Sequence, residues 1–388
     1  MPSLNPLLLS TDAPPMPASQ LWKDAYDGRC GRLIDLAQAV PGSPPRALLD
    51  RLAATAGTLE ATAYGAILGD AALREALAAD LGSLYSGRIA PSDIAITAGC
   101  NQAFFVTMLA LARRGDAVIL PTPWYFNHKM TLDMLGVDAV PLPCRADRGF
   151  IPTVEDARAL IGPMTRAIVL VSPNNPTGAI YPEATFRAFQ HLARETGVIL
   201  VLDETYRDFL PDGAGRPHDL FATPAWRDTT LQLYSFSKSY AIPGHRLGAI
   251  TADSSLLAEI VKVLDCMTIC PPRVAQPAVA WAVEGTRAWR TEIRATINRR
   301  AASFGEIVSA TSGWSISAIG AYFAYVRHPF AATALEAAER LATRAGVIAL
   351  PGSFFGPGQE DHLRFAFANA DERQLESLAE RLAAATVC

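Results

Sequence analysis

The chain has 388 residues, of which 50% are hydrophobic and 19% charged, and its formal net charge is −4. This length exceeds one ordinary hydrophobic core and predicts two domains, while the composition excludes a disordered chain. The slightly negative charge offers no electrostatic footprint for nucleic acid. No apolar run approaches the roughly 20 residues of a membrane span. The N-terminus lacks the basic start of a signal peptide, so we expect a cytoplasmic protein.

The six cysteines are scattered along the chain. Cys266 and Cys270 have the spacing C-x3-C, which differs from the C-x2-C of zinc and redox sites. The sequence therefore predicts reduced cytosolic thiols and no metal site.

The N-terminal residues 1–46 begin proline-rich and are expected to join a smaller domain, whereas residues 47–285 are predicted to form the larger one. From about Ser92 onward, short apolar runs alternate with helical patterns such as 108–115 and 185–197. The predicted strands lie within residues 93–99, 116–123, 137–143, 166–178, 198–206, 230–237 and 246–253. This alternation indicates a mostly parallel sheet covered by helices on both faces.

The unusual residues of this region collect where the predicted strands end. They are Gly99, Tyr125, Asn175, Asp203 and Lys238. Because ligands bind at the carboxyl ends of strands in such sheets, we expect these residues to surround a binding site.

Residues 286–388 are predicted to form the smaller domain. A helical pattern over 277–310 leaves the sheet region, and strands are predicted at 321–327, 346–352 and 362–369. An amphipathic helix follows over 371–385, with Asp371 as its N-cap.

Lys238 is one of the few lysines of a chain rich in arginine; the others are Lys23, Lys129 and Lys262. Arginine would serve equally well in an ion pair or on a solvated face. Lysine differs because its amine can lose a proton and attack a carbonyl carbon. The alternative reading is a surface lysine, since most lysines are exposed.

The residues around Lys238 offer complementary chemistry. Asp203 follows an apolar strand, where a carboxylate needs a cationic partner. Tyr125 provides a flat ring for stacking. The groups that fit a phosphate are Ser235, Ser237, Arg246 and the backbone N–H groups at Gly99 and Cys100. A buried acid, an aldehyde-trapping lysine, an aromatic plate and a phosphate cup together indicate pyridoxal 5′-phosphate (PLP) as the cofactor.

Several motifs occur in the order of a known family. They are "AYGAILGDAALREALA", "TAGCNQAF", "PTPWYFNH", "SPNNPTG", "VLDETY", "SFSKSYAIPGHRLG" and "LRFAFAN". In these motifs the chain resembles the class I/II, fold type I, PLP-dependent aminotransferases, over nearly its whole length. The resemblance implies an α/β fold, with a large domain around a mostly parallel mixed sheet and a smaller α+β domain. It also implies a homodimer with shared active sites.

The resemblance implies a role for each matching residue. Lys238 would bond the cofactor aldehyde, Asp203 would pair with the ring nitrogen, and Asn175 and Tyr206 would hydrogen-bond the ring oxygen. Tyr125 would stack on the ring. The phosphate would be held by Gly99, Cys100, Ser235, Ser237 and Arg246, together with Tyr64 from a neighbouring subunit.

The substrate side of the site is also implied by the resemblance. Arg364 would clamp the α-carboxylate, and Asn175 and Val40 would line the substrate site. Many relatives have glycine where this chain has Ala39, so the usual pose of the substrate is in question. No second arginine is identifiable for a distal carboxylate, and this gives no support to aspartate or glutamate as the main amino donor.

Alternative readings remain for individual positions. Asp203 could cap a helix, with Glu204 as the functional acid, and "SPNNPTG" could be an ordinary turn. Arg246 and Arg364 could be structural ion-pair partners. Trp124 could stack in place of Tyr125. The thiol of Cys100 is expected to be incidental, and His128 to be a packed or hydrogen-bonded side chain.

The activity expected from the resemblance is transfer of an amino group from an amino acid to a 2-oxo acid by a ping-pong mechanism. The alternative is a C–S β-lyase or a related amino-acid synthase on the same fold. A dehydrogenase is disfavoured because no strand leads into G-x-G-x-x-G, and the absence of a Gly-Lys dipeptide excludes a P-loop. A transcription factor with this fold would need an N-terminal DNA-binding domain, for which the sequence shows no room.

Overall fold

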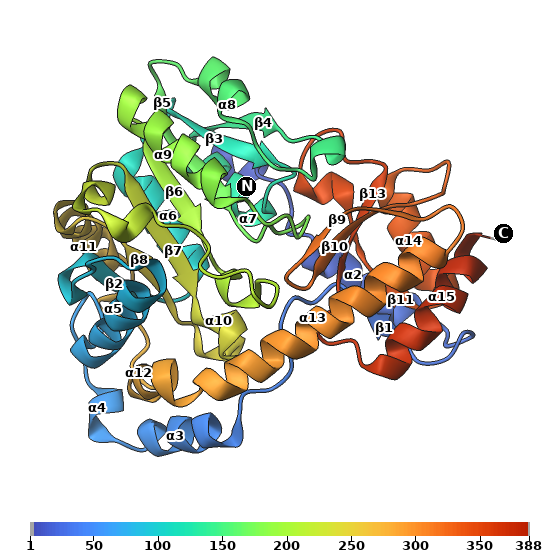
Figure 1. Cartoon of the computed structure of the whole chain (residues 1–388), viewed down its shortest axis with the longest axis horizontal. Coiled ribbons are helices and arrows are strands. Elements are labelled where there is room, and N and C mark those ends of the chain that lie inside the picture. The colour runs from blue at the N-terminus through green and yellow to red at the C-terminus, as the bar shows by residue number, and fades with distance from the viewer. Residues whose placement is uncertain (1–3, 387–388) are drawn as a thin grey trace.

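The computed structural model describes residues 4–386 and contains a large and a small sheet region (Figure 1). The large region is built on a seven-stranded sheet with the order β2-β8-β7-β6-β5-β3-β4. All of its neighbouring strands are parallel except β8, which is antiparallel to both β2 and β7. The strands are β2 (Ile94–Thr97), β3 (Ala117–Thr122), β4 (Asp138–Pro143), β5 (Thr165–Val171), β6 (Ile199–Asp203), β7 (Thr230–Ser235) and β8 (Gly248–Thr251).

Helices cover both faces of this sheet because its strands are apolar on both sides. On β5, Val169 packs in one core cluster with α6 and α11, while Ile168 and Leu170 pack in another with α9. The helices of this region are α3 (Arg46–Ala56), α4 (Leu59–Thr62), α5 (Ala71–Tyr85), α6 (Cys100–Leu111), α7 (Phe126–Leu135), α8 (Val154–Leu160), α9 (Glu183–Thr196), α10 (Phe236–Ser239), α11 (Ser254–Thr268) and α12 (Gln276–Gly285).

The small region holds a four-stranded antiparallel sheet with the order β12-β13-β10-β9. Its strands are β9 (Ser315–Gly320), β10 (Phe323–Arg327), β12 (Leu350–Pro351) and β13 (His362–Ala366), and its helices are α14 (Ala334–Ala345) and α15 (Glu372–Thr386). From the N-terminal part come α1 (Pro6–Ser10), α2 (Met16–Ala25) and β1 (Ile34–Asp35), and β1 pairs in parallel with β11 (Val347–Ile348). The boundaries at residues 46 and 285 stay a prediction.

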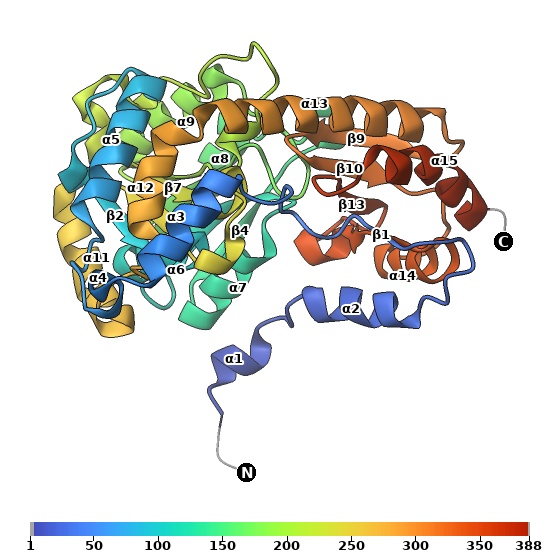
Figure 2. The same cartoon turned by 90° about the horizontal axis from the view of Figure 1, so that it is seen from below.

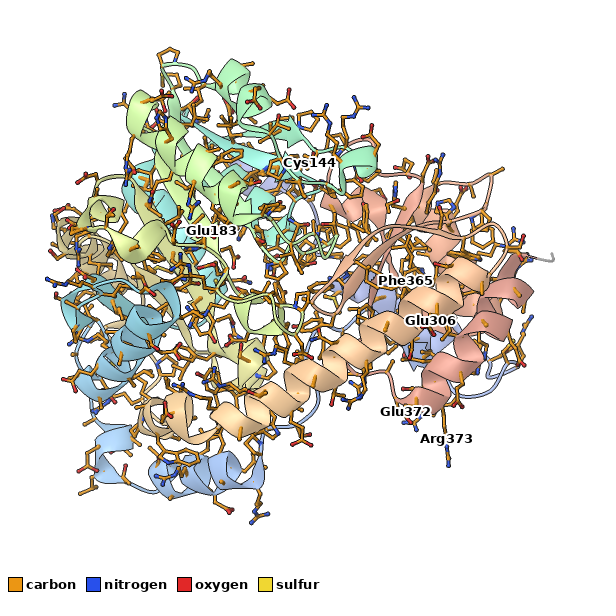
Figure 3. All side chains as sticks on the ribbon, viewed as in Figure 1. Cys144, Glu183, Glu306, Phe365, Glu372 and Arg373 are labelled. Carbon is orange, nitrogen blue, oxygen red and sulfur yellow. The ribbon has the colours of Figure 1, made fainter. Side chains whose placement is uncertain are left out.

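Helix α13 (Arg287–Ala310) runs from the large region along the small one (Figure 2). Phe365 of β13 is labelled in Figure 3. Its ring packs against Phe304 of α13, with ring centroids 5.5 Å apart. The helical pattern over 277–310 contains two helices, because α12 ends at Gly285 and Thr286 separates it from α13. A Cβ atom at Gly285 would lie 2.4 Å from the ring of Trp281, so a larger residue at this last position of α12 would displace that ring.

The predicted strands of the large region are all present, and three local expectations change. Helix α6 ends at Leu111, since Ala112 is already extended, and does not continue to Gly115. The predicted strand 346–352 divides into β11 and β12, which belong to different sheets. Strand β9 was not predicted. The N-cap at Asp371 is confirmed, because Gln374 N donates to Asp371 Oδ1 at 2.8 Å.

Among the described residues, no helix combines the length and the apolar character needed to cross a bilayer.

Candidate active site

A cavity of about 150 Å³ lies at the carboxyl ends of β5 and β6, where the predicted site residues converge. Most of its lining comes from strand ends and the turns that follow them, which is where parallel sheets bind ligands. The lining residues are Cys100, Asn101, Tyr125, Val171, Asn175, Asp203, Thr205, Tyr206, Ser237, Lys238, Pro243 and Arg246.

Lys238 enters this cavity from α10, a one-turn helix that directly follows β7. Ser235 begins the helix, and its Oγ accepts a hydrogen bond from Ser237 N at 3.3 Å. The Lys238 amine donates to the Ala39 carbonyl oxygen at 2.9 Å. Burial, followed by the nearby charges of Arg364 and Arg246, lowers the pKa of Lys238 to about 8. The neutral, nucleophilic amine is therefore accessible near neutral pH.

Asp203 ends β6 and is held by groups from three other segments. Oδ2 lies 3.2 Å from His128 Nε2, Oδ1 accepts from Thr205 N at 3.0 Å, and Cys100 Sγ lies 4.0 Å from Oδ1. Burial alone would raise the pKa of Asp203, but the hydrogen bond and charge of His128 and the hydrogen bonds of Thr205 lower it below the ordinary value. The side chain is thus a carboxylate facing the cavity, able to pair with a cationic ring nitrogen.

His128 is a site residue to which the sequence assigned no function. It lies on α7, one turn after Tyr125, stacks on Phe104 with centroids 3.9 Å apart, and is 3% exposed. The expectation of a packed, hydrogen-bonded histidine is correct, but its partner is the functional candidate Asp203. The spacing Tyr125-x-x-His128, which puts both side chains on one face of a helix, is the signal that could have identified it.

Tyr125 lines the cavity at the N-terminus of α7, and Trp124 does not. Asn127 Nδ2 donates to the Tyr125 hydroxyl at 2.8 Å and fixes the ring. Burial, and then the charge of Asp203, raise the pKa of Tyr125 to about 12, so the phenol is neutral. Of the two candidate stacking residues, the geometry favours Tyr125. Trp124 instead lines a neighbouring cavity with residues such as Phe126 and Met130.

Asn175, Tyr206 and Arg364 form one buried chain of polar groups. Asn175 Nδ2 donates to the Tyr206 hydroxyl at 3.5 Å, and Arg364 donates to Asn175 Oδ1 at 3.2 Å. Arg364 also donates to the Ala37 carbonyl, while its buried Nε has no hydrogen-bond partner among the described residues. Burial lowers the pKa of Arg364 to about 10. A buried guanidinium that forms no ion pair with an acidic side chain among residues 4–386 is suited to bind a carboxylate from a ligand.

The part of the cavity lined by Cys100 and Arg246 has the features of an anion site. Gly99 has φ +89° and precedes α6, whose first N–H groups are unpaired within the helix. A Cβ at Gly99 would lie 2.2 Å from the guanidinium of Arg246, and a Cβ at Gly248 would lie 2.6 Å from Cys100 N. Only glycine at both positions allows the arginine and the helix N-terminus to converge.

Five predicted site residues do not line this cavity. Two of them adjoin it, because Arg364 donates to the lining residue Asn175 and Gly99 directly precedes the lining residue Cys100. The other three are Tyr64, Ser235 and Val40. Tyr64 is 76% exposed and does not line the cavity of its own chain. Ser235 does not line the cavity and acts as the cap of α10. Val40 is half-buried beside Ala39, outside the lining residues.

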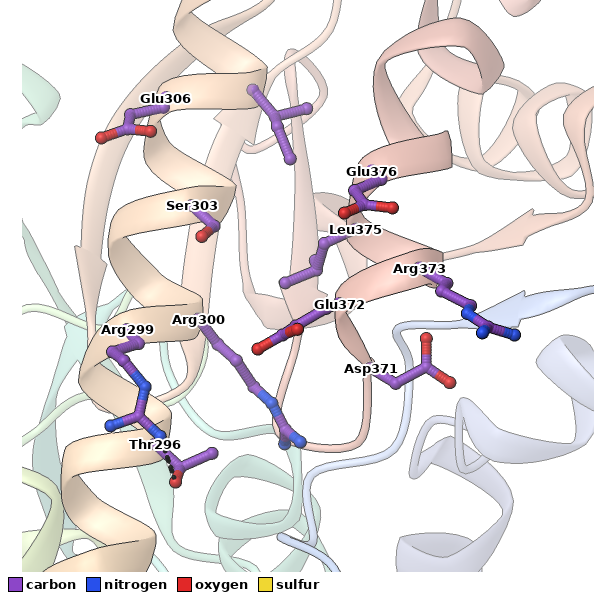
Figure 4. Close-up of a pocket in the computed structure, with 11 residues that line it drawn as sticks. Thr296, Arg299, Arg300, Ser303, Glu306, Asp371, Glu372, Arg373, Leu375 and Glu376 are labelled. Carbon is purple, nitrogen blue, oxygen red and sulfur yellow. Dashed lines mark hydrogen bonds between the residues drawn. The ribbon is translucent and has the colours of Figure 1, made fainter.

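The donor set fits PLP in each of its parts. Lys238 is the nucleophilic amine, Asp203 the acid, Tyr125 the ring platform, and the Gly99–Arg246 cradle the anion site. A larger cavity lies elsewhere. It is an open cleft of about 850 Å³ between α13 and α15, lined by side chains of both charges, including Arg300, Glu306 and Glu372 (Figure 4). Chemistry, not size, therefore identifies the candidate active site.

Comparison with known proteins identifies the family of the chain. The family model "Aminotransferase class I and II" matches residues 34–382. The chain belongs to this family. It is 31% identical to an arginine–pyruvate transaminase of Pseudomonas aeruginosa, over 78% of this chain and 77% of that protein. It is also 31% identical to an aspartate/prephenate aminotransferase of Thermus thermophilus, over 83% of each protein. A solved structure of a Thermus thermophilus aspartate aminotransferase double mutant matches with a TM-score of 0.91 and 28% identity, covering 99% of this chain and 100% of that one.

The protein is therefore a PLP-dependent aminotransferase of fold type I, which acts on an amino acid and a keto acid. The predicted fold class, family, enzyme class and cofactor are confirmed. The lyase or synthase alternative is not favoured, because the relatives are named as aminotransferases.

Proposed function

We propose that Lys238, Asp203 and Arg364 carry the amino transfer of this aminotransferase by a ping-pong mechanism. The observation that supports this most directly is the Lys238 amine in one cavity with Asp203 and with the cradle of Arg246. Bound PLP supplies an electron sink for the bonding electrons released at the substrate Cα. The residues of the chain hold the reactants and move the proton.

Lys238 is the proposed acid–base group. Its lowered pKa of about 8 provides a neutral amine that can take the proton from the donor Cα in the first half-reaction, and in the second its protonated form can deliver a proton to the corresponding carbon of the acceptor. The carboxylate of Asp203 would pair with the cofactor ring nitrogen and favour its protonated form, which strengthens the electron sink. Asn175 and Tyr206 would hydrogen-bond the ring oxygen, and Tyr125 would stack on the ring.

Arg364 is the proposed carboxylate clamp. Its guanidinium lies 5.3 Å from the ring of Phe323 and 5.4 Å from that of Phe355, so the carboxylate would bind between aromatic walls. Arg246 is the only arginine among the described residues that line the cavity, and it faces the anion cradle. Arg364, which donates to the lining residue Asn175, is then the one arginine left for a substrate carboxylate. We therefore infer a donor with a single carboxylate and an acceptor that is a 2-oxo acid. The named relatives act on arginine with pyruvate, or on aspartate and prephenate.

The proposed assembly is a homodimer in which Tyr64 completes the partner's phosphate site. Tyr64, Met267 and Ile269 are exposed by 76%, 46% and 42%. Arg273 donates to Tyr64 O, and Gly65 N donates to Cys270 Sγ, so these two loops form one surface. Ile269 has φ +62°, a strained conformation for a β-branched residue. An apolar, strained surface of this kind supports a subunit contact. A cytoplasmic location stays a prediction.

Borohydride trapping tests the assignment of Lys238. Protein loaded with PLP is reduced and digested, and the label is expected on the peptide of Lys238. K238A should lose the label and the conversion of cofactor to its amine form by any amino acid. K262A, which changes an exposed lysine paired with Glu259, is the matched control and should retain both. A label on another peptide contradicts the proposal.

Mixed dimers test the shared site. K238A and Y64A are each expected to be impaired alone. Unfolding and refolding them together should restore about a quarter to a half of wild-type activity, because one site of the mixed dimer would receive both Lys238 and Tyr64. If Tyr64 served its own subunit, no mixed site would be complete and activity would not return.

A further inference from the structure

A buried carboxylate lies directly behind the lysine. Asp208 belongs to the short turn Arg207–Phe209, which begins one residue after Tyr206. Its Oδ2 accepts hydrogen bonds from Ser239 Oγ at 2.5 Å and from the Tyr234 hydroxyl at 2.7 Å. Ser239 is the residue after Lys238, so this carboxylate holds the helix turn that carries the amine.

Arg290 of α13 completes this cluster. It donates to Asp208 Oδ1 at 3.1 Å and to the Val283 carbonyl at 2.6 Å. Its guanidinium lies 5.0 Å over the ring of Tyr240. The side chains of Arg290 and Asp208 are only 11% and 18% exposed, so their attraction is weakly screened by solvent. Arg290 thus contacts Tyr240 directly and is connected to Ser239 through Asp208.

Helix α10 depends on such outside contacts because it is very short. A helix of four residues makes almost no internal hydrogen bonds, and its direction is set by what its side chains contact. Asp208, Ser239, Tyr240 and Arg290 do not line the active-site cavity. They can therefore affect the reaction only through the residues they hold.

We propose that Asp208 and Arg290, acting through Ser239, are positioning residues that set the direction of the Lys238 amine. The same contacts couple that amine to α13, which continues into the small region (Figure 2). The inference rests on the proposed role of Lys238. It adds that a displacement of α13 relative to the large sheet would change how well the amine reaches the substrate Cα.

The test compares S239A, S239T and D208N in the full-length holoenzyme. S239A loses the hydroxyl that joins α10 to Asp208, and kcat is expected to fall about 10- to 100-fold, as for a small misplacement of a reacting group. KM should change by less than about threefold, because the substrate clamp is untouched. S239T keeps a hydroxyl and should recover activity to within about threefold of wild type.

Two readouts other than activity separate positioning from general stability. The rate at which the apoprotein captures PLP covalently should fall in S239A and D208N by a factor similar to that in kcat. The midpoint of the pH titration of lysine-bound cofactor absorbance should also shift. The effects of S239A and D208N should be less than additive, because both break one connection.

D116N is the matched control. Asp116 is 2% exposed and accepts from Arg166 at 2.9 Å, just before β3 and at the opposite end of the sheet from the cavity. This variant should lower the unfolding temperature while leaving kcat, PLP capture and the titration midpoint unchanged. If S239A and D208N also lower only the unfolding temperature and leave kcat, PLP capture and the titration midpoint unchanged, the positioning role is refuted. Failure of the proposed function is distinguishable, because K238A would then still capture PLP.

Discussion

Asp203 and Glu204 are neighbours in sequence, but their surroundings differ in kind. Both are buried carboxylates with a histidine nitrogen at 3.2 Å, namely His128 for Asp203 and His218 for Glu204. Strand alternation sends them to opposite faces of β6. Asp203 faces the cavity that contains Lys238, whereas Glu204 faces packed protein and accepts a hydrogen bond from Tyr85 at 2.7 Å, with a second from Gln232.

The difference shows that burial and a charged partner do not by themselves identify a functional acid. For each carboxyl, burial would raise the pKa and the charge and hydrogen bonds of its neighbours lower it below the usual range. What distinguishes Asp203 is open space on one side and a nucleophilic amine across it. Glu204 has the same ionisation and no room for a ligand.

Exchange of each carboxylate for its amide gives the largest expected contrast. D203N removes the charge that would pair with the cofactor ring, and kcat should fall by about 100- to 1000-fold, the usual effect of losing a group that stabilises developing charge. E204Q should keep kcat within about threefold and lower the free energy of unfolding by about 1–3 kcal/mol, since its partners are less well satisfied. Steady-state kinetics and denaturant unfolding measure both. A loss of kcat in E204Q equal to that in D203N would remove the distinction.

The sequence was sufficient for the residues that follow directly from strand ends. Asp203, Lys238 and Asn175 each sit in a short local motif, so one strand and its turn place the side chain. The spacing from Tyr125 could have placed His128 on the site-facing side of α7, but its pairing with Asp203 joins residues far apart in the chain and follows from no local pattern. Strand β9 was missed because its residues are half-buried without a clear alternation. The cluster of Asp208 and Arg290 joins segments far apart in the chain and was likewise out of reach.

The next prediction concerns how Lys238 affects the stability of the protein without its cofactor. Its pKa is about 8 in the fold against 10.5 for the ordinary side chain, so the fold disfavours the ammonium. Below pH 8 this lowers the free energy of unfolding by about 3 kcal/mol. The loss disappears as the pH rises from 8 to 10.5, where the amine becomes neutral in the unfolded chain as well. The apoprotein of K238M should therefore be more stable than the wild-type apoprotein at pH 7, with the gap closing at higher pH.

Denaturant unfolding of both apoproteins across this pH range measures the gap. K262M, at an exposed site, should change stability by less than about 0.5 kcal/mol. A gap for K238M that stays constant from pH 7 to 10.5 would show that burial of the amine is not the cause.

The two histidines sharpen the comparison further. H128F keeps a ring against Phe104 but loses the N–H that faces Asp203, so burial would raise the pKa of this carboxyl. The acid limb of the pH–kcat profile should move to higher pH, with a loss of about tenfold on that limb per pKa unit. H218F loses the corresponding partner of Glu204 and should lower the unfolding temperature with the profile unmoved. If the pH–kcat profiles of H128F and H218F moved by the same amount, the separate roles of Asp203 and Glu204 would be contradicted.

The smallest expected effect on kcat is that of replacing Cys100, which lies beside Asp203. Burial, and then the charge of Asp203, raise the pKa of its thiol well above the ordinary value, so the sulfur is protonated and weakly reactive. Its backbone N–H, at the start of α6, is the group that would meet a phosphate, and C100S leaves it in place. We expect kcat within about twofold of wild type, equivalent to less than about 0.5 kcal/mol. Alkylation of the native apoprotein should modify the exposed Cys266 well before Cys100. A tenfold loss of kcat in C100S would instead show that the thiol, 4.0 Å from Asp203 Oδ1, takes part in holding that carboxylate.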